Sequence, residues 1–360
     1  MSTLYINGQS YPFESIKREG ITLLKESEHT HQSSFQLIQD WLTDKQSFLF
    51  TTSGSTGTPK PIELNRSQLE TSARGTIQAL TLKAADHFLV CMNTSFIGGA
   101  MLIIRALLVD ANITLKEPSS NPLKLIPDNH SYTFASFAPL QLFPIIQNVY
   151  SEKERLSRFK QILVGGGILD SQLEKEIAAL PVKVFHTYGM TETVSHIALR
   201  EIGKQETYTK IANVQLKTDN RGCLAICCAA TNNEWVQTND VVELLDSCSF
   251  IFLGRADDVI NSGGIKIWPN KIEQIIRERL TTFATNVFVY GIPDAKLGQK
   301  LIAVIETSYE SSLLPSLLKS EPNLTKYEVP KQYFTLPSFE YTPTGKINKA
   351  ETLKMLGLQV

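Results

Sequence analysis

The segment TTSGSTGTPK, residues 51–60, combines residue types that suit the binding of phosphate. It holds six Ser or Thr residues, two glycines and a final lysine, and it directly follows the apolar residues Phe48 to Phe50. Hydroxyls, uncovered backbone N–H groups and a cation all attract phosphate oxygens. Gly54 and Gly57 are three positions apart, which excludes the G-x-x-x-x-G-K-[ST] pattern of P-loop kinases and GTPases. A solvated Ser/Thr linker is the alternative to a phosphate-binding loop.

The elements that must position this segment are predicted from hydrophobic patterning. Strand-like stretches at 48–52, 88–92, 159–164 and 182–188 alternate with helix-like ones, including 100–108. Such alternation predicts α/β layers around a parallel sheet. Asn65 is a predicted N-cap of a helix that carries Leu69, Ala73, Ile77 and Leu80 on one face, so we expect strand, loop and helix in that order.

The pattern changes twice further along the chain. From Gly222 short apolar stretches separated by polar turns predict antiparallel strands, as a sheet or small barrel. Beyond Arg255 a helix that begins at Pro269 precedes two further strands. The predicted fold is therefore α/β: a large N-terminal domain (1–254) of layered α/β sheets with a small β-rich subdomain, and a small mobile α+β C-terminal domain (255–360).

Composition limits the classes of function. The 360 residues carry a net charge of −1, without a dense Lys/Arg run, which argues against nucleic acid or an anionic membrane as a partner. The sequence has no stretch of eighteen apolar residues and no signal-peptide pattern at its start, so a cytoplasmic protein without membrane insertion is expected. The spacing of its five cysteines and six histidines predicts no metal site.

Five segments together resemble the motifs of the adenylate-forming enzymes, the superfamily of acyl- and aryl-CoA synthetases. They occur in the order of that family and span residues 52 to 349. The segments are TSGSTGTPK (52–60), YGMTE (188–192), TND (238–240), GRADDVINSGGIKIWPNKIE (254–273) and PTGKINK (343–349).

The resemblance implies a site for ATP and Mg²⁺. Tyr188 would stack on adenine, Thr191 would bind the α-phosphate, and Glu192 would offer Mg²⁺ a carboxylate oxygen. Asp240 and Arg255 would hold the ribose. The full set implied for ATP or AMP is Thr52, Ser53, Gly54, Ser55, Thr56, Gly57, Lys60, Gly165, Gly166, Gly167, His186, Thr187, Tyr188, Gly189, Asp240 and Arg255.

The same resemblance implies a reaction in two steps, with Lys346, Thr191 and Glu192 as catalytic residues. Lys346 would stabilise the charge that develops when a carboxylate attacks the α-phosphorus of ATP. Coenzyme A would then take the acyl group after the C-terminal domain turns about Asp257, with Gly263 and Gly264 beside the pantetheine.

Within the family the chain most resembles the o-succinylbenzoate-CoA ligases of menaquinone synthesis, with fewer residues ahead of the 51–60 segment than is usual. Arg105 lies where those ligases have an arginine for the second carboxylate of the substrate. Phe96 replaces their usual histidine, which is a departure from the pattern. An arginine in so apolar a helix is costly to bury unless an acid offsets the cost, or unless the side chain reaches the helix edge.

Two alternatives remain open. The protein could load another aryl or fatty acid onto CoA or onto a carrier-protein phosphopantetheine. It could also be a noncatalytic nucleotide-binding or scaffold protein, although the chemical residues of the family motifs are present. A homodimer is an option that the sequence leaves open.

Overall fold

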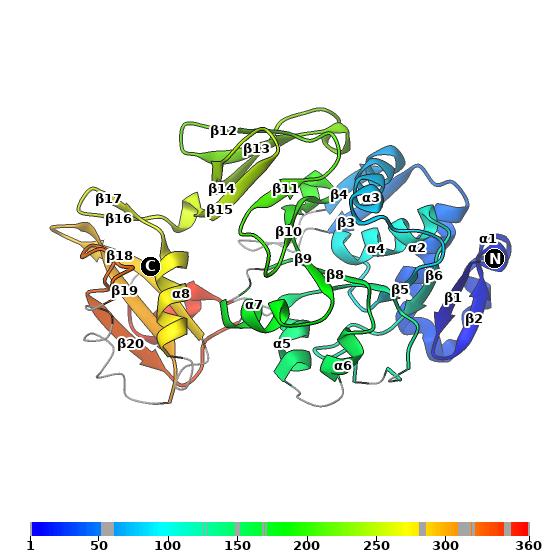
Figure 1. Ribbon diagram of the computed structural model, residues 1–360, viewed down its shortest axis with the longest axis horizontal. Helices are drawn as coiled ribbons and strands as arrows, with labels where there is room; N and C mark the ends of the chain where they lie inside the picture. The colour runs from blue at the N-terminus through cyan, green and yellow to red at the C-terminus, as the bar shows by residue number, and fades with distance from the viewer. Residues whose placement is uncertain are drawn as a thin grey trace.

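The computed structural model describes residues 2–51, 61–124, 126–127, 129–147, 152–167, 169, 171–280, 286–308, 318, 321–341 and 347–358. Among these residues the largest element is a 13-stranded mixed sheet (Figure 1). Its strands are, in spatial order, β12 (Gln215–Thr218), β13 (Cys223–Cys227), β14 (Val236–Leu244), β15 (Ser249–Arg255), β11 (Tyr208–Lys210), β10 (Ser195–Glu201), β9 (Lys183–Met190), β8 (Gln161–Val164), β7 (Phe134–Phe137), β5 (His87–Val90), β6 (Asn112–Leu115), β1 (Thr3–Ile6) and β2 (Gln9–Pro12).

The strands from β9 to β1 form a parallel block, as the alternation of strands and helices predicted. Helices cover both of its faces. The helices of the N-terminal part are α1 (Phe13–Glu19), α2 (Gln32–Leu42), α3 (Arg66–Leu80), α4 (Ile97–Leu108), α5 (Pro139–Gln147), α6 (Glu152–Leu156) and α7 (Ser171–Ala178), with the 3-10 turns η1 (Gly20–Leu23), η2 (Glu26–His31), η3 (Thr191–Thr193) and η4 (Ala229–Thr231).

Successive side chains of these strands enter two different cores. Phe88 and Val90 of β5 pack with α2, α3 and α4, whereas Leu89 between them packs with α5, α6 and α7. This is the period of two that a strand imposes on its side chains. Because both faces are covered, the parallel strands are apolar throughout, which is why the sequence revealed them as short continuous apolar runs.

The segment after Phe50 folds differently from the expected order of strand, loop and helix. Strand β3 (Ser47–Thr51) pairs antiparallel with β4 (Pro61–Asn65), and this two-stranded sheet precedes α3. The helix does begin at the predicted cap, since the Asn65 side chain accepts from the N–H of Gln68 while the Gln68 side chain accepts from the N–H of Asn65. The N-terminus of α3 therefore does not directly follow the 51–60 segment.

The strands after Gly222 are antiparallel as predicted, and they extend the main sheet through β10 and β11. A second sheet of five strands follows. It consists of β17 (Ile265–Ile267), β16 (Ile260–Ser262), β19 (Gly298–Glu306), β18 (Asn286–Asp294) and β20 (Gln332–Leu336), with the turn η5 (Ala256–Asp258) ahead of it and the helices α8 (Pro269–Arg279) and α10 (Lys349–Met355) beside it.

The second sheet has cores of its own on both faces. Val287 and Val289 of β18 pack with α8, and Phe288 between them packs with Leu353 of α10. These clusters contain none of the described residues ahead of Ile260. Separate cores fit the proposed division into two domains, while the boundary at residues 254 and 255 stays a prediction.

Candidate active site

Three glycines lie where strand β8 ends, at the carboxyl edge of the parallel block. Val164 of β8 pairs with His186 of β9, so Gly165 to Gly167 lie beside the next residues of β9. A Cβ atom on Gly165 would lie 2.1 Å from the hydroxyl oxygen of Thr187, so a side chain there would displace that hydroxyl. Gly166 has φ +82° with open space beside it. Gly166 and Gly167 are exposed and leave backbone uncovered at the edge where open α/β sheets bind ligands.

His186 fixes the position of this glycine segment. Its Nε2 lies 3.0 Å from the carbonyl oxygen of Gly167, and its Nδ1 lies 2.6 Å from the hydroxyl of Tyr208. Burial lowers the pKa of His186, against the opposing effect of the hydrogen bond to Gly167. In the neutral ring Nε2 carries the proton, because a carbonyl oxygen can only accept. His186 is therefore a structural support beneath the glycines.

Asp240 of β14 pairs with Arg255 of the neighbouring strand β15, and both lie close to Tyr188 of β9, which is not a neighbour of β14 in the sheet. The Tyr188 hydroxyl donates to Asp240 at 2.7 Å, and Arg255 Nη1 donates to the other carboxylate oxygen at 3.4 Å. Strands β10, β11 and β15 lie between β9 and β14 in the sheet order, so the antiparallel end of the sheet must curl to close this contact. The half-buried ring of Tyr188 packs edge-on against Phe250, with centroids 5.0 Å apart.

The Tyr188 phenol stays protonated and serves as a donor. Burial raises its pKa, and the negative charge of Asp240 raises it further. The Asp240 carboxylate is held from both sides, so its remaining lone pairs have a fixed direction toward a ligand hydroxyl. Its suitability for a ribose therefore has a geometric basis, while the stacking of Tyr188 on adenine stays a prediction.

A sharp turn presents Thr191 and Glu192 between β9 and β10. A Cβ on Gly189 would lie 2.2 Å from the carbonyl oxygen of Ser195, so only glycine permits this close approach. The Thr193 hydroxyl binds the main chain of Met190 and Ser195 and closes the turn.

Glu192 is exposed, and its carboxylate binds no other described residue. Among the described residues, no cluster of three or more His, Cys, Asp or Glu side chains could hold a metal ion. A lone exposed carboxylate fits Mg²⁺, which is usually held by one or two carboxylates together with the phosphate oxygens of a substrate.

Arg105 of α4 lies beneath the same turn and is the most unusual charge of the described structure. Its side chain is 1 % exposed, its Nε has no hydrogen-bond partner, and its Nη2 donates to the Ser195 hydroxyl at 3.4 Å. No carboxylate of the described residues forms an ion pair with it, and burial lowers its pKa to about 9. Because this guanidinium is buried without a described carboxylate partner, Arg105 is a candidate binding site for an anion.

Among the predicted site residues that the structure describes, those of the 165–167 and 186–192 segments, Asp240, Arg255 and Arg105 lie in one region. Gly165 to Gly167 lie beside Thr187 and Tyr188 at the end of β9, Tyr188 contacts Asp240 of β14, and Arg105 contacts Ser195 after the turn. Phe96, at the N-cap of α4, is half-buried. The sequence analysis missed Ser195 and His196, whose position three and four residues after the YGMTE motif is the one signal that could have revealed them.

His196 borders the Arg105 site as an uncharged group. Its Nε2 lies 2.8 Å from the Thr76 hydroxyl, and burial together with the charge of Arg105 lowers its pKa well below the ordinary value. The ring therefore adds no second positive charge beside Arg105. The candidate anion site is therefore a single buried guanidinium with an uncharged histidine beside it.

Several predicted site residues lie outside the described residues. These are Thr52, Ser53, Gly54, Ser55, Thr56, Gly57, Lys60 and Lys346. The described residues that flank them are paired, Thr51 with Pro61 and Tyr341 with Ile347. Of the residues predicted for the hinge and the second step, Asp257 lies in η5, and Gly263 and Gly264 form the turn between β16 and β17 with φ of +59° and +81°.

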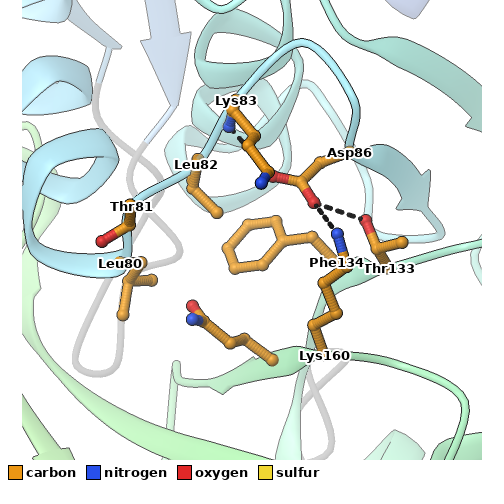
Figure 2. Close-up of a pocket in the computed structure, with 9 residues that line it drawn as sticks. Leu80, Thr81, Leu82, Lys83, Asp86, Thr133, Phe134 and Lys160 are labelled. Atoms are coloured by element: carbon orange, nitrogen blue, oxygen red, sulfur yellow. Dashed lines mark hydrogen bonds and ion pairs between the residues drawn. The ribbon is translucent and has the colours of Figure 1, made fainter.

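A pocket of about 230 Å³ lies at the opposite edge of the parallel block (Figure 2). Phe134 and Gln161, which line it, are the first residues of β7 and β8, whereas the three glycines follow the last residue of β8. Asp86 in its wall accepts from Lys160 at 2.9 Å and from Thr133 at 3.0 Å. These bonds join the residues just ahead of β5, β7 and β8, at the edge away from the candidate active site.

We expect Asp86→Asn to lower the free energy of unfolding at pH 7 by about 2 kcal/mol, because hydrogen bonds to a charged group are lost. Burial would raise the pKa of Asp86, but its bonds from Lys160, the Lys83 N–H and Thr133 outweigh burial and lower it. A depressed carboxyl pKa stabilises the fold above its unfolded value, near 4, and the gain disappears as the pH falls through the folded pKa.

Urea denaturation at pH 7 and at pH 3 measures this effect. The difference between wild type and Asp86→Asn should shrink at the lower pH. Glu243→Gln, at an exposed residue, is the control and should change neither value by more than ~0.5 kcal/mol. An equal difference at both pH values would contradict the role assigned to the carboxylate charge.

Comparison with known proteins identifies the class that this fold and site define. Residues 15–220 match the AMP-binding enzyme family, and the chain belongs to that family. A solved structure from Dyadobacter fermentans, described as an acyl-CoA synthetase (AMP-forming)/AMP-acid ligase II-like protein, is 37 % identical with a TM-score of 0.62 and covers 93 % of this chain and 97 % of its own.

Two further proteins are similar to most of this chain. A 2-succinylbenzoate–CoA ligase of Enterococcus faecalis is 27 % identical over 91 % of this chain and 73 % of its own length. The o-succinylbenzoate coenzyme A synthetase of Bacillus subtilis, solved in complex with ATP and magnesium ion, superposes with a TM-score of 0.72 at 21 % identity over 85 % of this chain and 69 % of its own, and it confirms the fold. Among the described residues, no helix combines the length and the apolar character that crossing a membrane requires.

Proposed function

We propose that this protein is an ATP-dependent acid-CoA ligase that acts through an acyl adenylate, with o-succinylbenzoate as its acid. The observation that carries the proposal is buried Arg105, a guanidinium without a described carboxylate partner beneath the turn that presents Thr191 and Glu192. A second carboxylate on the substrate would offset the cost of burying that charge. Two relatives, each 27 % identical over 91 % and 84 % of this chain, are named 2-succinylbenzoate–CoA ligases, which supports this choice of acid.

In the first half-reaction an oxygen of the acid's carboxylate forms a bond to the α-phosphorus of ATP, and the bond from that phosphorus to the β,γ-pyrophosphate breaks. Asp240 and Arg255 orient the ribose, and the glycines after β8 leave space for the base. Thr191 donates its hydroxyl to an α-phosphate oxygen. Glu192, together with the phosphates, would hold Mg²⁺, which would supply neutralisation of negative charge.

In the second half-reaction the thiolate of CoA attacks the acyl carbonyl, and AMP leaves with the bonding electron pair. Neither half-reaction requires a covalent nucleophile from the protein. Between the two half-reactions, the second sheet is proposed to rotate about the connection near Asp257. This rotation brings Gly263 and Gly264 to the site. We also propose that the enzyme works in the cytoplasm, with small molecules as its substrates.

Exchange of labelled pyrophosphate into ATP, measured with a panel of carboxylic acids, tests this proposal. We expect exchange that depends on the acid and is fastest with o-succinylbenzoate. Addition of CoA or of a phosphopantetheine carrier protein to the preformed adenylate then distinguishes the two acceptors, with CoA expected to react. ATP binding without exchange for any acid would support the noncatalytic alternative instead.

We expect Asp240→Asn to raise the Kd for ATP about 20-fold, because an amide puts a donor where two hydroxyls need acceptors. Tyr188→Phe removes one hydrogen bond to Asp240 and leaves the carboxylate in place, so we expect a rise of about threefold. Calorimetric titration with ATP measures both constants. Equal effects of the two substitutions would contradict the direct role of Asp240.

A further inference from the structure

The main-chain connection between the two sheets is short. Arg255 is the last residue of β15 in the 13-stranded sheet, η5 follows, and Ile260 begins β16 in the smaller sheet. Each sheet has its own cores. Any rotation of one sheet relative to the other must therefore change backbone dihedral angles within this connection.

Asp257 in this connection is held by side chains of the larger sheet. Asn239 of β14 directs its Nδ2 toward both carboxylate oxygens of Asp257, at 3.3 and 3.1 Å, and Arg255 Nη2 donates to one of them at 3.0 Å. The Asn239 Oδ1 accepts from Arg221 Nη1 at 3.2 Å, and Arg221 pairs in turn with Asp219. The hydrogen bonds thus run from the turn between β12 and β13 to the connection.

The amide of Asn239 fits this position in one orientation. A carboxylate can only accept and a guanidinium can only donate, so the nitrogen must face Asp257 and the oxygen must face Arg221. Arg255 extends the same network to Asp240, the residue proposed for the ribose. Asn239 therefore lies between the nucleotide site and the connection.

We propose that Asn239 is a positioning residue, which holds Asp257 in the present arrangement of the two sheets and so delays the second half-reaction. This inference rests on the proposed function, in which Gly263 and Gly264 reach the site for that step. Figure 1 shows the β16–β17 hairpin, which carries these glycines, well apart from β8 and β9. The bonds to Asp257 must break before the hairpin can approach.

The first measurement does not depend on activity. Hydrogen exchange of the backbone amides of residues 256–262 is compared in the wild type, Asn239→Ala and Asn239→Asp. Because Asp257 is 53 % exposed, water competes for its bonds, and we expect exchange to rise about threefold in Asn239→Ala. Asn239→Asp places a second negative charge against Asp257 and should raise the rate of hydrogen exchange further. Asn220→Ala, an exposed asparagine on the neighbouring turn, is the matched control and should not change it.

The second measurement separates the half-reactions. Pyrophosphate exchange should stay within twofold of wild type in Asn239→Ala, while release of the CoA thioester from preformed adenylate becomes about three times faster. Unchanged hydrogen exchange in both variants, or a thioester step that is unchanged or slower, would overturn the inference. A wild type without pyrophosphate exchange for any acid would instead contradict the proposed function, and hydrogen exchange alone would then decide whether Asn239 holds the connection.

Discussion

Replacing Arg105 by methionine is expected to raise the KM for o-succinylbenzoate about 100-fold, because an acid bound to a buried guanidinium loses its partner charge. The same substitution should increase the free energy of unfolding by about 1–2 kcal/mol. Arg105 is 1 % exposed with an unpaired Nε, and burial lowers its pKa to about 9. A group that binds its proton less tightly when folded destabilises the fold at neutral pH, and methionine removes that cost.

Steady-state kinetics and urea denaturation of the same preparations measure the two effects. A substrate analogue that lacks the second carboxylate, 4-oxo-4-phenylbutanoate, provides the control within the site. The wild type should bind the analogue about as weakly as Arg105→Met binds o-succinylbenzoate, and the substitution should not weaken the analogue further. An equal rise in KM for both acids in Arg105→Met would mean that Arg105 supports the fold of the turn and does not bind the substrate. In that case the substrate assignment fails and the family assignment stands.

Lys346→Ala is expected to lower the rate of pyrophosphate exchange 100- to 1,000-fold, the range typical for removal of one group that stabilises developing charge. Lys346 itself lies outside the described residues, so the expectation comes from the PTGKINK motif. The flanking residues are firmly placed: Tyr341 bridges to Ile347, its hydroxyl donates to Glu306 at 2.7 Å, and the Asn348 N–H donates to the Glu340 carbonyl at 2.7 Å. The ends of the segment are therefore held on the C-terminal sheet.

The two half-reactions again distinguish the explanations. Thioester formation from chemically prepared adenylate should stay within about threefold of wild type, because Lys346 acts on the α-phosphorus and not on the thioester step. Lys354→Ala, on the exposed face of α10 beside Glu351, is the control and should leave both rates unchanged. Full exchange activity in Lys346→Ala would show that another cation serves the first step.

Local signals in the sequence predicted most of the elements. The Asn65 cap, Pro269 at the start of α8 and the apolar runs of the parallel strands all act over a few residues, so a sequence shows them directly. Strand β4 was missed because Pro61 and Glu63 do not resemble a buried strand, and pairing with β3 stabilises it from outside its own sequence.

The site could be predicted where a motif keeps its residues close together in the sequence, as in HTYGMTE. Contacts between residues that are far apart in the sequence could not be predicted. The bond between Tyr188 and Asp240 requires the curl of the antiparallel strands, and the contact of Arg105 with Ser195 requires α4 to pack beneath β10. The pairing of Asn239 with Asp257 joins residues eighteen positions apart on different elements. Sequence patterns alone give no measure of such distances.

The alternation of side chains between two cores in each sheet has an evolutionary consequence. Neither face of the smaller sheet depends on apolar residues ahead of Ile260. Recombination between relatives in the segment after Arg255 would therefore exchange a self-contained module, without exposing a buried apolar core of either fragment. New thiol acceptors could in this way be acquired independently of changes in acid preference.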